Sequence, residues 1–230
     1  MKAFVLAGGL GTRLRPRFGD LPKPLAPLGG RPFLVRQLET LRAGGVRHAV
    51  VLAGYGADQV RAVLAACALD MTLELSVEDE PLGTAGALAR ARPFVGNDAI
   101  VVVNGDTLCE CEPWRLEQLR WQQGRLGALA LFRAADAAAR GRVECGERMV
   151  VRAFVEKDPA FHGPAWVNGG MYAFSPALWR RLPAGPGSLE RDVLPALARE
   201  CQLHGLPCAG RFWDIGTPED FARAERELHA

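Results

Sequence analysis

Short apolar runs alternate with amphipathic segments along the first half of the chain. The apolar runs that predict buried strands are residues 2–7, 48–53, 71–77 and 99–103. The segments whose apolar residues recur at helical spacing are 32–42, 57–67 and 84–91. Strands that alternate with helices in this way are typical of parallel βαβ units in a doubly wound sheet with both faces covered.

The second half of the chain has more strands and a more polar pattern. The predicted strands are 126–132, a hairpin over 142–156, and 166–174, which two glycines interrupt. The predicted helices are 113–123, 188–200 and 218–228. Ser188 can cap the second of these helices, but Arg191 stands where a capping box has an acid. The whole pattern predicts one α/β domain over residues 1–230, with a doubly wound, mostly parallel sheet and a small β-rich lobe.

Composition places the chain among globular proteins and narrows its partners. It has 230 residues, of which 49% are hydrophobic, which is enough for a sizeable core. The formal net charge of +2 gives no basic face of the kind that binds nucleic acid. No apolar run is long enough to span a bilayer, and the N-terminal run reaches glycines before the apolar part of a signal peptide is complete. We therefore expect a cytoplasmic protein that binds neither membrane nor nucleic acid.

Cysteine and lysine usage adds two smaller points. The six cysteines follow neither a disulfide framework nor a zinc-knuckle spacing, so reduced thiols are expected. Only three of the 28 basic residues are lysine, at positions 2, 23 and 157. A lysine in a chain that otherwise uses arginine indicates a place for a compact ammonium group.

A glycine-rich loop follows the first predicted strand. It contains Gly8, Gly9 and Gly11, then Arg13, and Lys23 lies downstream. Open α/β sheets bind ligands at the carboxyl ends of their strands, and glycines let backbone N–H groups approach phosphate oxygens closely. Arg13 can clamp a phosphate with two hydrogen bonds, and Lys23 can add a point charge. The loop lacks the Gly-Lys-Ser/Thr of a Walker loop, and no helix opens at its third glycine as in a dinucleotide fingerprint.

Two aspartates are candidates for a metal site. Asp106 follows the strand 99–103 in the sequence Asn104-Gly105-Asp106, which places it at the carboxyl edge of the sheet. Mg²⁺ is typically held by one or two protein carboxylates together with phosphate oxygens. Asp214 is the second candidate. Taken alone, each of the two is equally well an ordinary acid of a turn or loop.

Motifs along nearly the whole chain resemble the signature of the sugar-1-phosphate nucleotidyltransferases. They are LAGGLGTRLRP (6–16), LPKPLAPLGGRPFL (21–34), EPLGTAGAL (80–88), VNGDTL (103–108), FVEK (154–157), VNGGMY (167–172), SLERDVLP (188–195) and FWDIGTPEDF (212–221). Within that family the sequence is most similar to the D-glycero-α-D-manno-heptose 1-phosphate guanylyltransferases, above all in NGDTL, SLE and DIGTPEDF. The resemblance implies a Rossmann-like nucleotidyltransferase fold whose β-rich lobe binds the sugar.

The resemblance also implies a magnesium-dependent reaction. A phosphate oxygen of a sugar 1-phosphate attacks the α-phosphorus of a nucleoside triphosphate, and pyrophosphate leaves. Because this nucleophile is already an anion at neutral pH, no general base is needed and the four histidines need no catalytic role. Matched onto the family's motifs, Arg13, Lys23 and Lys157 would be the catalytic residues, and Asp106 and Asp214 would bind Mg²⁺.

The same motifs imply residues for each of the two substrates. Those implied for the nucleotide are Leu6, Ala7, Gly8, Gly9, Gly11, Thr12, Glu78, Glu80, Gly83 and Thr84. Those implied for the sugar are Asn104, Gly105, Glu156, Asn168 and Gly169. In this scheme Lys157 would hold the sugar phosphate and Glu156 a sugar hydroxyl.

The choice of base is predicted from residues 78–84, which correspond to the family's base-recognition loop. Relatives that use pyrimidine nucleotides often place Gln near the start of this loop, because an amide both donates and accepts hydrogen bonds. An ionised Glu78 or Glu80 only accepts, and guanine offers two adjacent donors, N1–H and N2–H₂. We therefore expect GTP as the nucleotide. The alternative is that both acids are solvated loop charges.

Other interpretations stay open from the sequence. The substrates could be mannose 1-phosphate with GTP, or N-acetylmuramate 1-phosphate with UTP. A non-catalytic regulator that binds a nucleotide-sugar is a more remote alternative, because such homologues usually lose a phosphate-clamping or metal residue. A metal-dependent glycosyltransferase would carry an Asp-x-Asp motif, where this chain has Asn104-Gly105-Asp106.

Overall fold

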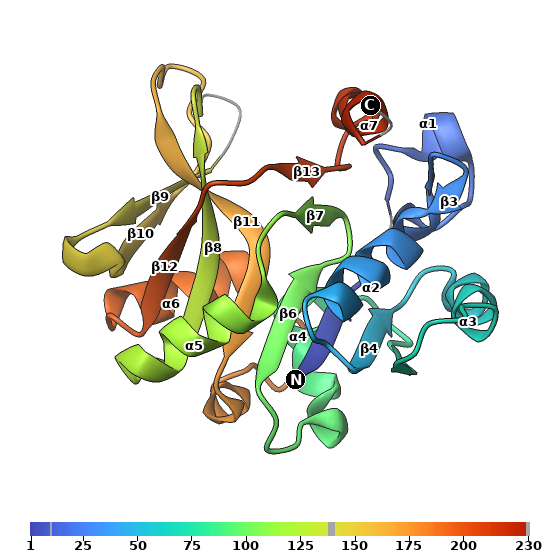
Figure 1. Cartoon of the computed structure of the whole chain (residues 1–230), viewed down its shortest axis with the longest axis horizontal. Coiled ribbons are helices and arrows are strands. Elements are labelled where there is room, and N and C mark those ends of the chain that lie inside the picture. Colours follow the sequence, from blue (N-terminus) through green and yellow to red (C-terminus); the bar gives the residue numbers. More distant parts are fainter. Residues whose placement is uncertain (10, 138–140, 229–230) are drawn as a thin grey trace.

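The computed structural model describes residues 1–9, 11–137 and 141–228. A nine-stranded sheet runs through the molecule, with helices on both of its faces (Figure 1). Its strands are β1 (Lys2–Leu6), β4 (His48–Ala53), β5 (Thr72–Val77), β6 (Ile100–Asn104), β8 (Gly127–Ala134), β9 (Arg142–Cys145), β10 (Val151–Val155), β11 (Ala165–Phe174) and β12 (Leu203–Cys208). Two small sheets pair β2 (Pro27–Leu28) with β3 (Arg31–Pro32) and β7 (Thr107–Cys109) with β13 (Phe212–Asp214).

Most of the α-helices follow the predicted amphipathic segments closely, but no predicted segment corresponds to the first of them. They are α1 (Arg15–Phe18), α2 (Phe33–Ala43), α3 (Ala57–Ala65), α4 (Gly83–Arg90), α5 (Pro113–Gln123), α6 (Leu194–Arg199) and α7 (Pro218–Glu227). Thr217 caps α7, since its side chain accepts a hydrogen bond from the Asp220 N–H. In the part of the chain that the structure describes, every helix is too short or too polar to cross a membrane.

The parallel half of the sheet contains β5, β4, β1 and β6, in that order. The chain first builds outward from β1 through β4 to β5, and then returns to place β6 on the other side of β1. This change of direction leaves a crevice at the carboxyl ends of β1 and β6, where Leu6 and Asn104 are register partners. Open α/β sheets bind their ligands at such a crevice.

The residues of β1 show why both faces of the sheet are covered. Ala3 and Val5 point to one face and Phe4 to the other, and all three are fully buried. The first face packs against α2 and α3, through residues such as Leu38. The second packs against α4, through residues such as Leu88. Helices on both faces confirm the predicted doubly wound α/β fold.

Strand β11 joins the parallel half to the second half of the molecule. One edge of β11 pairs with antiparallel β8, while the other pairs first with β9 and then with β6. The change occurs at a register shift between Asn168 and Tyr172, where the two predicted glycines interrupt the strand. A Cβ on Gly169 would lie 2.5 Å from the Phe132 ring, so this close approach requires glycine. The predicted hairpin is present as antiparallel β9 and β10.

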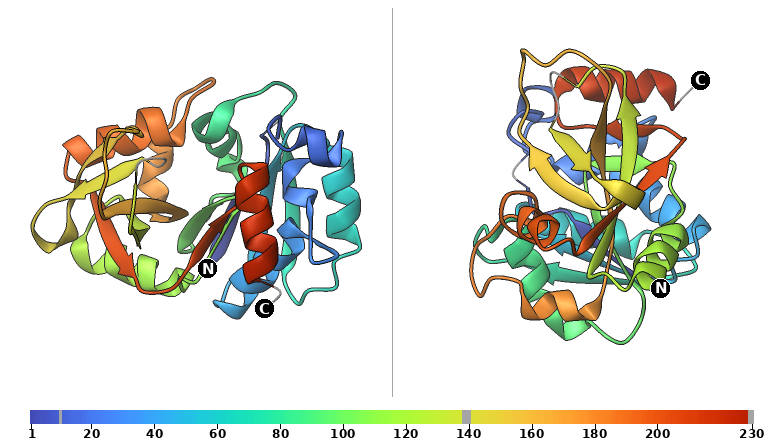
Figure 2. Two further views of the ribbon diagram at one scale, coloured as in Figure 1. Left: turned by 90° about the horizontal axis from the view of Figure 1, so that it is seen from above. Right: turned by 90° about the vertical axis from the view of Figure 1, so that its left-hand side faces the viewer.

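The C-terminal segment returns from the second half of the molecule to the first. After β12, the chain passes through β13 to α7, which lies beside α1 (Figures 1 and 2). The rings of Phe18 and Phe221 stand edge to face with their centroids 4.9 Å apart, and Arg17 forms a 2.9 Å ion pair with Glu225. Strand β13, which ends at Asp214, is therefore held at the crevice by the helix that follows it.

Some elements differ from the prediction. The hydrophobic pattern predicts none of β7, β12 and β13, because β7 and β13 have only three residues each and β12 contains glycine and proline. The helix predicted over 188–200 begins instead as a π-helical turn, Leu189–Val193, and continues as α6.

The close contact between β1 and the end of β6 yields a first prediction. The Gly105 N–H donates to the Leu6 carbonyl at 2.9 Å, and a Cβ on Gly105 would lie 2.5 Å from that oxygen. We expect Gly105→Ala to lower the free energy of unfolding by about 1–3 kcal/mol, because the two backbones must separate. The matched control is Gly96→Ala, where a Cβ would meet nothing within 4 Å. Urea denaturation measures both, and equal midpoints for the two variants would contradict the proposed contact.

Candidate active site

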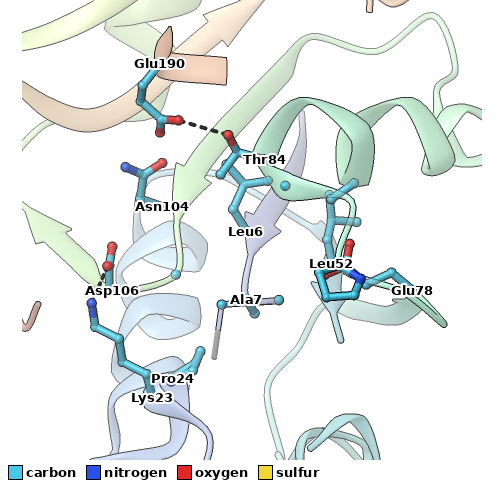
Figure 3. A pocket seen from close by; sticks show the side chains of 16 residues that line it. Leu6, Ala7, Lys23, Pro24, Leu52, Glu78, Thr84, Asn104, Asp106 and Glu190 are labelled. Atoms are coloured by element: carbon cyan, nitrogen blue, oxygen red, sulfur yellow. Dashed lines mark hydrogen bonds and ion pairs between the residues drawn. The ribbon is translucent and has the colours of Figure 1, made fainter. Parts of the chain in front are cut away.

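Of two neighbouring cavities, the first lies at the carboxyl ends of the parallel strands and the second lies beside β9 and β10. The first has a volume of about 320 Å³ and is shown in Figure 3. Its lining residues are Leu6, Ala7, Gly8, Gly9, Lys23, Pro24, Leu52, Glu78, Pro81, Gly83, Thr84, Ala87, Asn104, Gly105, Asp106 and Glu190. The second has a volume of about 680 Å³. Its lining residues are Gly141, Arg142, Val143, Phe154, Val155, Glu156, Val167, Asn168, Glu190, Arg191, Pro195, Phe212 and Asp214.

Glu78 closes one end of the first cavity, at the carboxyl end of β5. A Cβ on Gly8 would lie 2.3 Å from a Glu78 carboxylate oxygen, and one on Gly54 would lie 2.7 Å from the same oxygen. The Leu82 N–H donates to the other carboxylate oxygen at 3.3 Å. Burial raises the pKa of Glu78, and the Leu82 N–H and Arg90 partly offset this effect. Two glycines and one backbone N–H thus hold a half-buried carboxylate in the cavity wall.

Lys23 and Asp106 form an ion pair on the opposite side of the first cavity (Figure 3). The Lys23 Nζ lies 2.5 Å from Asp106 Oδ2, and only 11% of the lysine side chain is exposed. Lys23 begins a 3₁₀ turn, and a Cβ on Gly11 would lie 2.9 Å from the Lys23 Cβ. The glycine-rich loop therefore packs over the lysine stem and directs its ammonium group toward Asp106.

Strands β7 and β13 bring Asp214 next to Asp106. Asp214 is the register partner of Thr107, and the Ile215 N–H donates to the Asp106 carbonyl at 3.0 Å. The Gly216 N–H donates to the Asp214 carboxylate at 2.6 Å. Burial, and then the negative charge of Asp106, raise the pKa of Asp214, while Lys23 acts in the opposite direction. Two carboxylates therefore share one lysine.

This pair of carboxylates fits a hard divalent cation better than a softer metal. The described residues contain no cluster of three or more His, Cys, Asp or Glu side chains that could hold a metal ion. Mg²⁺ does not need such a cluster, because it is commonly held by one or two carboxylates together with substrate phosphates and water. Asp106 and Asp214 are the residues that could hold it here.

The second cavity is lined by both polar and charged groups. The Asn168 amide donates to the buried Tyr172 hydroxyl at 2.8 Å and accepts from the Gly170 N–H at 3.0 Å, which fixes its orientation. Glu156 and Arg142 lie on the hairpin side of the cavity. The Arg142 guanidinium stacks 3.8 Å from the Phe161 ring centroid, and its Nη1 is buried without a hydrogen-bond partner in the described structure. A guanidinium N–H that lacks a partner can donate a hydrogen bond to an anionic ligand.

The structure brings most of the residues implied by the motifs to these two cavities, but not all of them. Those outside both linings are Gly11, Thr12, Arg13, Glu80, Lys157 and Gly169. Arg13, Glu80 and Lys157 have exposed side chains, and Lys157 directly follows Glu156 at the cavity edge. Gly169 gives room to the Phe132 ring rather than to the cavity.

Sequence reasoning also missed residues that line the cavities. Leu52 is the register partner of Leu6 near the end of β4, and its position at the same sheet edge was available from the predicted strand. Glu190 and Arg191 lie in the segment SLERDVLP, which is recognisable as a capping sequence without any hint of what its side chains face. Arg142 begins the predicted hairpin and carries no distinguishing motif.

Comparison with known proteins gives one matching family and several similar sequences. The family model described as Nucleotidyl transferase matches residues 2–230. A mannose-1-phosphate guanylyltransferase catalytic subunit beta from Danio rerio is 37% identical over 226 residues. A mannose-1-phosphate guanyltransferase from Emericella nidulans is 35% identical over 227 residues. Each alignment covers 96% of this chain but only 62% of the relative, so the chain spans less than two thirds of their length.

Two solved structures match the fold over almost its full extent. The crystal structure of HddC from Yersinia pseudotuberculosis is 30% identical, with a TM-score of 0.87, and 99% of each chain is covered. The same protein complexed with GMP-PN is matched with 29% identity and a TM-score of 0.85, again over 99% of each chain. The similarity therefore extends through both halves of the molecule and includes the segments that line the two cavities.

Proposed function

The chain belongs to the nucleotidyl transferase family, and we propose that it transfers GMP from GTP to a sugar 1-phosphate with release of pyrophosphate. The observation that carries this proposal is the meeting of two cavities beside the carboxylates of Asp106 and Asp214. One cavity has the glycine-rich wall that suits a nucleotide, and the other is larger and lined by polar groups. Two substrates bound in this way would face each other at the carboxylate pair.

The first cavity supports GTP as the nucleotide. Glu78 presents a carboxylate that accepts hydrogen bonds, and guanine has two adjacent donors on the edge that would face it. The related protein from Yersinia pseudotuberculosis was crystallised with GMP-PN, and the similar curated sequences are guanylyltransferases by name. Both lines of support favour guanine over a pyrimidine base.

The chemistry we propose needs positioning and charge neutralisation rather than proton transfer. A phosphate oxygen of the sugar 1-phosphate forms the new bond to the α-phosphorus of GTP, and the bond to the leaving pyrophosphate breaks. Asp106 and Asp214 would hold Mg²⁺, which supplies positive charge to the phosphate oxygens. Lys23, already directed at Asp106, is within reach of the same phosphates. Arg13 and Lys157 have exposed side chains outside both cavity linings, so they would bind phosphate only after these side chains turn inward.

For the sugar, we propose a 1-phosphate of manno configuration. The sequence motifs resemble those of enzymes that use D-glycero-α-D-manno-heptose 1-phosphate, which is our first candidate. The names of the curated relatives favour mannose 1-phosphate, which is the second. The two sugars share the same ring and differ by one carbon at its exocyclic end. A cavity of about 680 Å³ has room for the longer of the two.

The reaction itself is tested by a panel of substrates. We expect pyrophosphate release with Mg²⁺ only when GTP is combined with a sugar 1-phosphate of manno configuration, and higher kcat/KM for the heptose than for mannose. Asp106→Asn should lower kcat by a factor of about 100 or more, because weaker binding of Mg²⁺ leaves less positive charge at the reacting phosphates. Asp70→Asn, at an exposed surface pair with Arg42, is the matched control.

The possible outcomes of this panel separate the candidates. Turnover with UTP and N-acetylmuramate 1-phosphate would keep the reaction class and reject both the base and the sugar that we propose. No turnover with any pair would favour a regulator that binds a nucleotide-sugar.

Base selection gives a separate prediction. We expect Glu78→Gln to reduce the preference for GTP over the other nucleoside triphosphates by about tenfold or more, because a hydrogen bond to a charged acceptor is lost. The raised pKa of Glu78 also predicts a pH effect. As the pH falls through that pKa, the carboxylate is protonated and KM for GTP rises, whereas Glu78→Gln should lack this rise. Asp58→Asn, at an exposed position on α3 near Arg61, is the control. An unchanged nucleotide preference would remove Glu78 from base recognition.

A further inference from the structure

Glu190 lies at the junction of the two cavities. Among the residues that the structure describes, it alone lines both of them. In the view of Figure 3, Asn104 lies between the pair formed by Glu190 and Thr84 and the pair formed by Lys23 and Asp106. The sequence motifs assign no role to Glu190, so its function has to be argued from this position.

The turn that carries Glu190 is a π-helix, and its sequence explains the shape. Pro195 has no N–H to donate to the Arg191 carbonyl, so a regular α-helical ladder is interrupted at this point. The Arg191 N–H donates to Ser188 Oγ at 3.1 Å, and the Ser188 N–H donates to the Asp192 carboxylate at 2.7 Å. Asp192 thus completes the capping box one residue later than expected, because the wider turn holds an extra residue. Glu190 is therefore carried by a well-braced turn.

Thr84 connects Glu190 to the loop assigned to the nucleotide base. The Thr84 hydroxyl oxygen accepts from the Leu189 N–H at 2.7 Å, so its own hydrogen is directed at Glu190 Oε2, 2.9 Å away. Two backbone hydrogen bonds of 2.9 Å also join Gly187 to Leu82 in this loop and to Ala85, the residue that follows it. The position of the Glu190 carboxylate and that of the base-recognition loop are consequently linked.

The acceptors at the junction match sugar hydroxyls better than phosphates. The hydrogen bond from Thr84 occupies one carboxylate oxygen of Glu190, and the Ser188 hydroxyl lies 3.4 Å from that same oxygen. The other oxygen is left for a ligand. Asn104 Oδ1 is buried and has no hydrogen-bond partner in the described structure. Hydroxyl groups donate hydrogen bonds to such acceptors, whereas an ionised phosphate only accepts and is repelled by a carboxylate.

We propose that Glu190 is a specificity-determining residue for the sugar. Its free carboxylate oxygen accepts hydrogen bonds from ring hydroxyls of the sugar 1-phosphate, and its bond with Thr84 holds the base-recognition loop against the occupied sugar cavity. This inference rests on the proposed transfer reaction and adds the contact that selects the sugar. Glu156, which the motifs imply as a sugar ligand, lines only the second cavity.

Variants at the two ends of this link give the first test. We expect Glu190→Gln to raise KM for the sugar 1-phosphate by about tenfold or more, while KM for GTP stays close to the wild-type value. Thr84→Val removes the link and should raise KM for both substrates, whereas Thr84→Ser retains the hydroxyl and should restore both. Glu144→Gln removes one exposed charge from β9 in the same half of the molecule and is the control. Melting curves check that each variant folds.

Deoxy sugars provide a sharper test, because a general loss of structure would not reproduce the result. For wild type, we expect at least one monodeoxy sugar 1-phosphate to have a KM about tenfold or more above that of the parent sugar. In Glu190→Gln, removal of that same hydroxyl should raise KM little further, because the group that accepts its hydrogen bond is already altered. Equal penalties in the two proteins for every deoxy analogue would overturn the proposal.

A binding measurement separates failure of this inference from failure of the transfer reaction. Calorimetry measures the affinity for the sugar 1-phosphate in the presence of Mg²⁺ and an α,β-methylene analogue of GTP, which the protein cannot cleave. Absent turnover, with binding that is weakened by Glu190→Gln, would reject the transfer reaction and keep the role of Glu190. Turnover that is unaffected by Glu190→Gln would keep the transfer reaction and reject the role of Glu190. No sugar binding by any of the proteins would overturn both.

Discussion

The repulsion between the carboxylates of Asp106 and Asp214 is the constraint on which the site depends. Burial and the charge of Asp106 both raise the pKa of Asp214, which means that the folded protein disfavours the charged form of this residue. Lys23 offsets one of the two negative charges, at 2.5 Å from Asp106. Two carboxylates that share one lysine leave the site short of positive charge, which favours a ligand that brings it. A divalent cation bound with the phosphates of a nucleotide would satisfy both acids.

Several elements of the fold hold Asp106 and Asp214 close together. Strand β6 ends beside β1 and delivers Asp106 to the crevice, where the chain must come close enough to require Gly105. Strand β13 brings Asp214 from the far end of the sequence, and its pairing with β7 fixes the register. Helix α7, packed on α1, holds the end of β13 in place. The glycine-rich loop and the π-helical turn then complete the two cavities on either side.

The parts that sequence reasoning predicted are those with a strong local signal. Long apolar runs predicted β1, β4 and β6. Residues that follow these runs closely, such as Asp106, lie at the predicted edge of the sheet. The three-residue strands β7 and β13 form only because each finds the other, which no local pattern shows. Glu190 was missed for the same reason, since its position depends on a contact with Thr84, which is distant in sequence. The motifs likewise implied roles for Arg13 and Lys157 without showing that both side chains are exposed.

The most direct measurement is the location of a divalent cation in crystals of the protein grown with Mn²⁺ and a GTP analogue that cannot be cleaved. The anomalous scattering of Mn²⁺ distinguishes it from water and from the lighter atoms around it. The account predicts one strong anomalous peak that is coordinated by Asp106 and Asp214 and by phosphate oxygens of the nucleotide in the first cavity. Nucleotide bound in that cavity without a peak at the two carboxylates, or with the peak elsewhere, would contradict it.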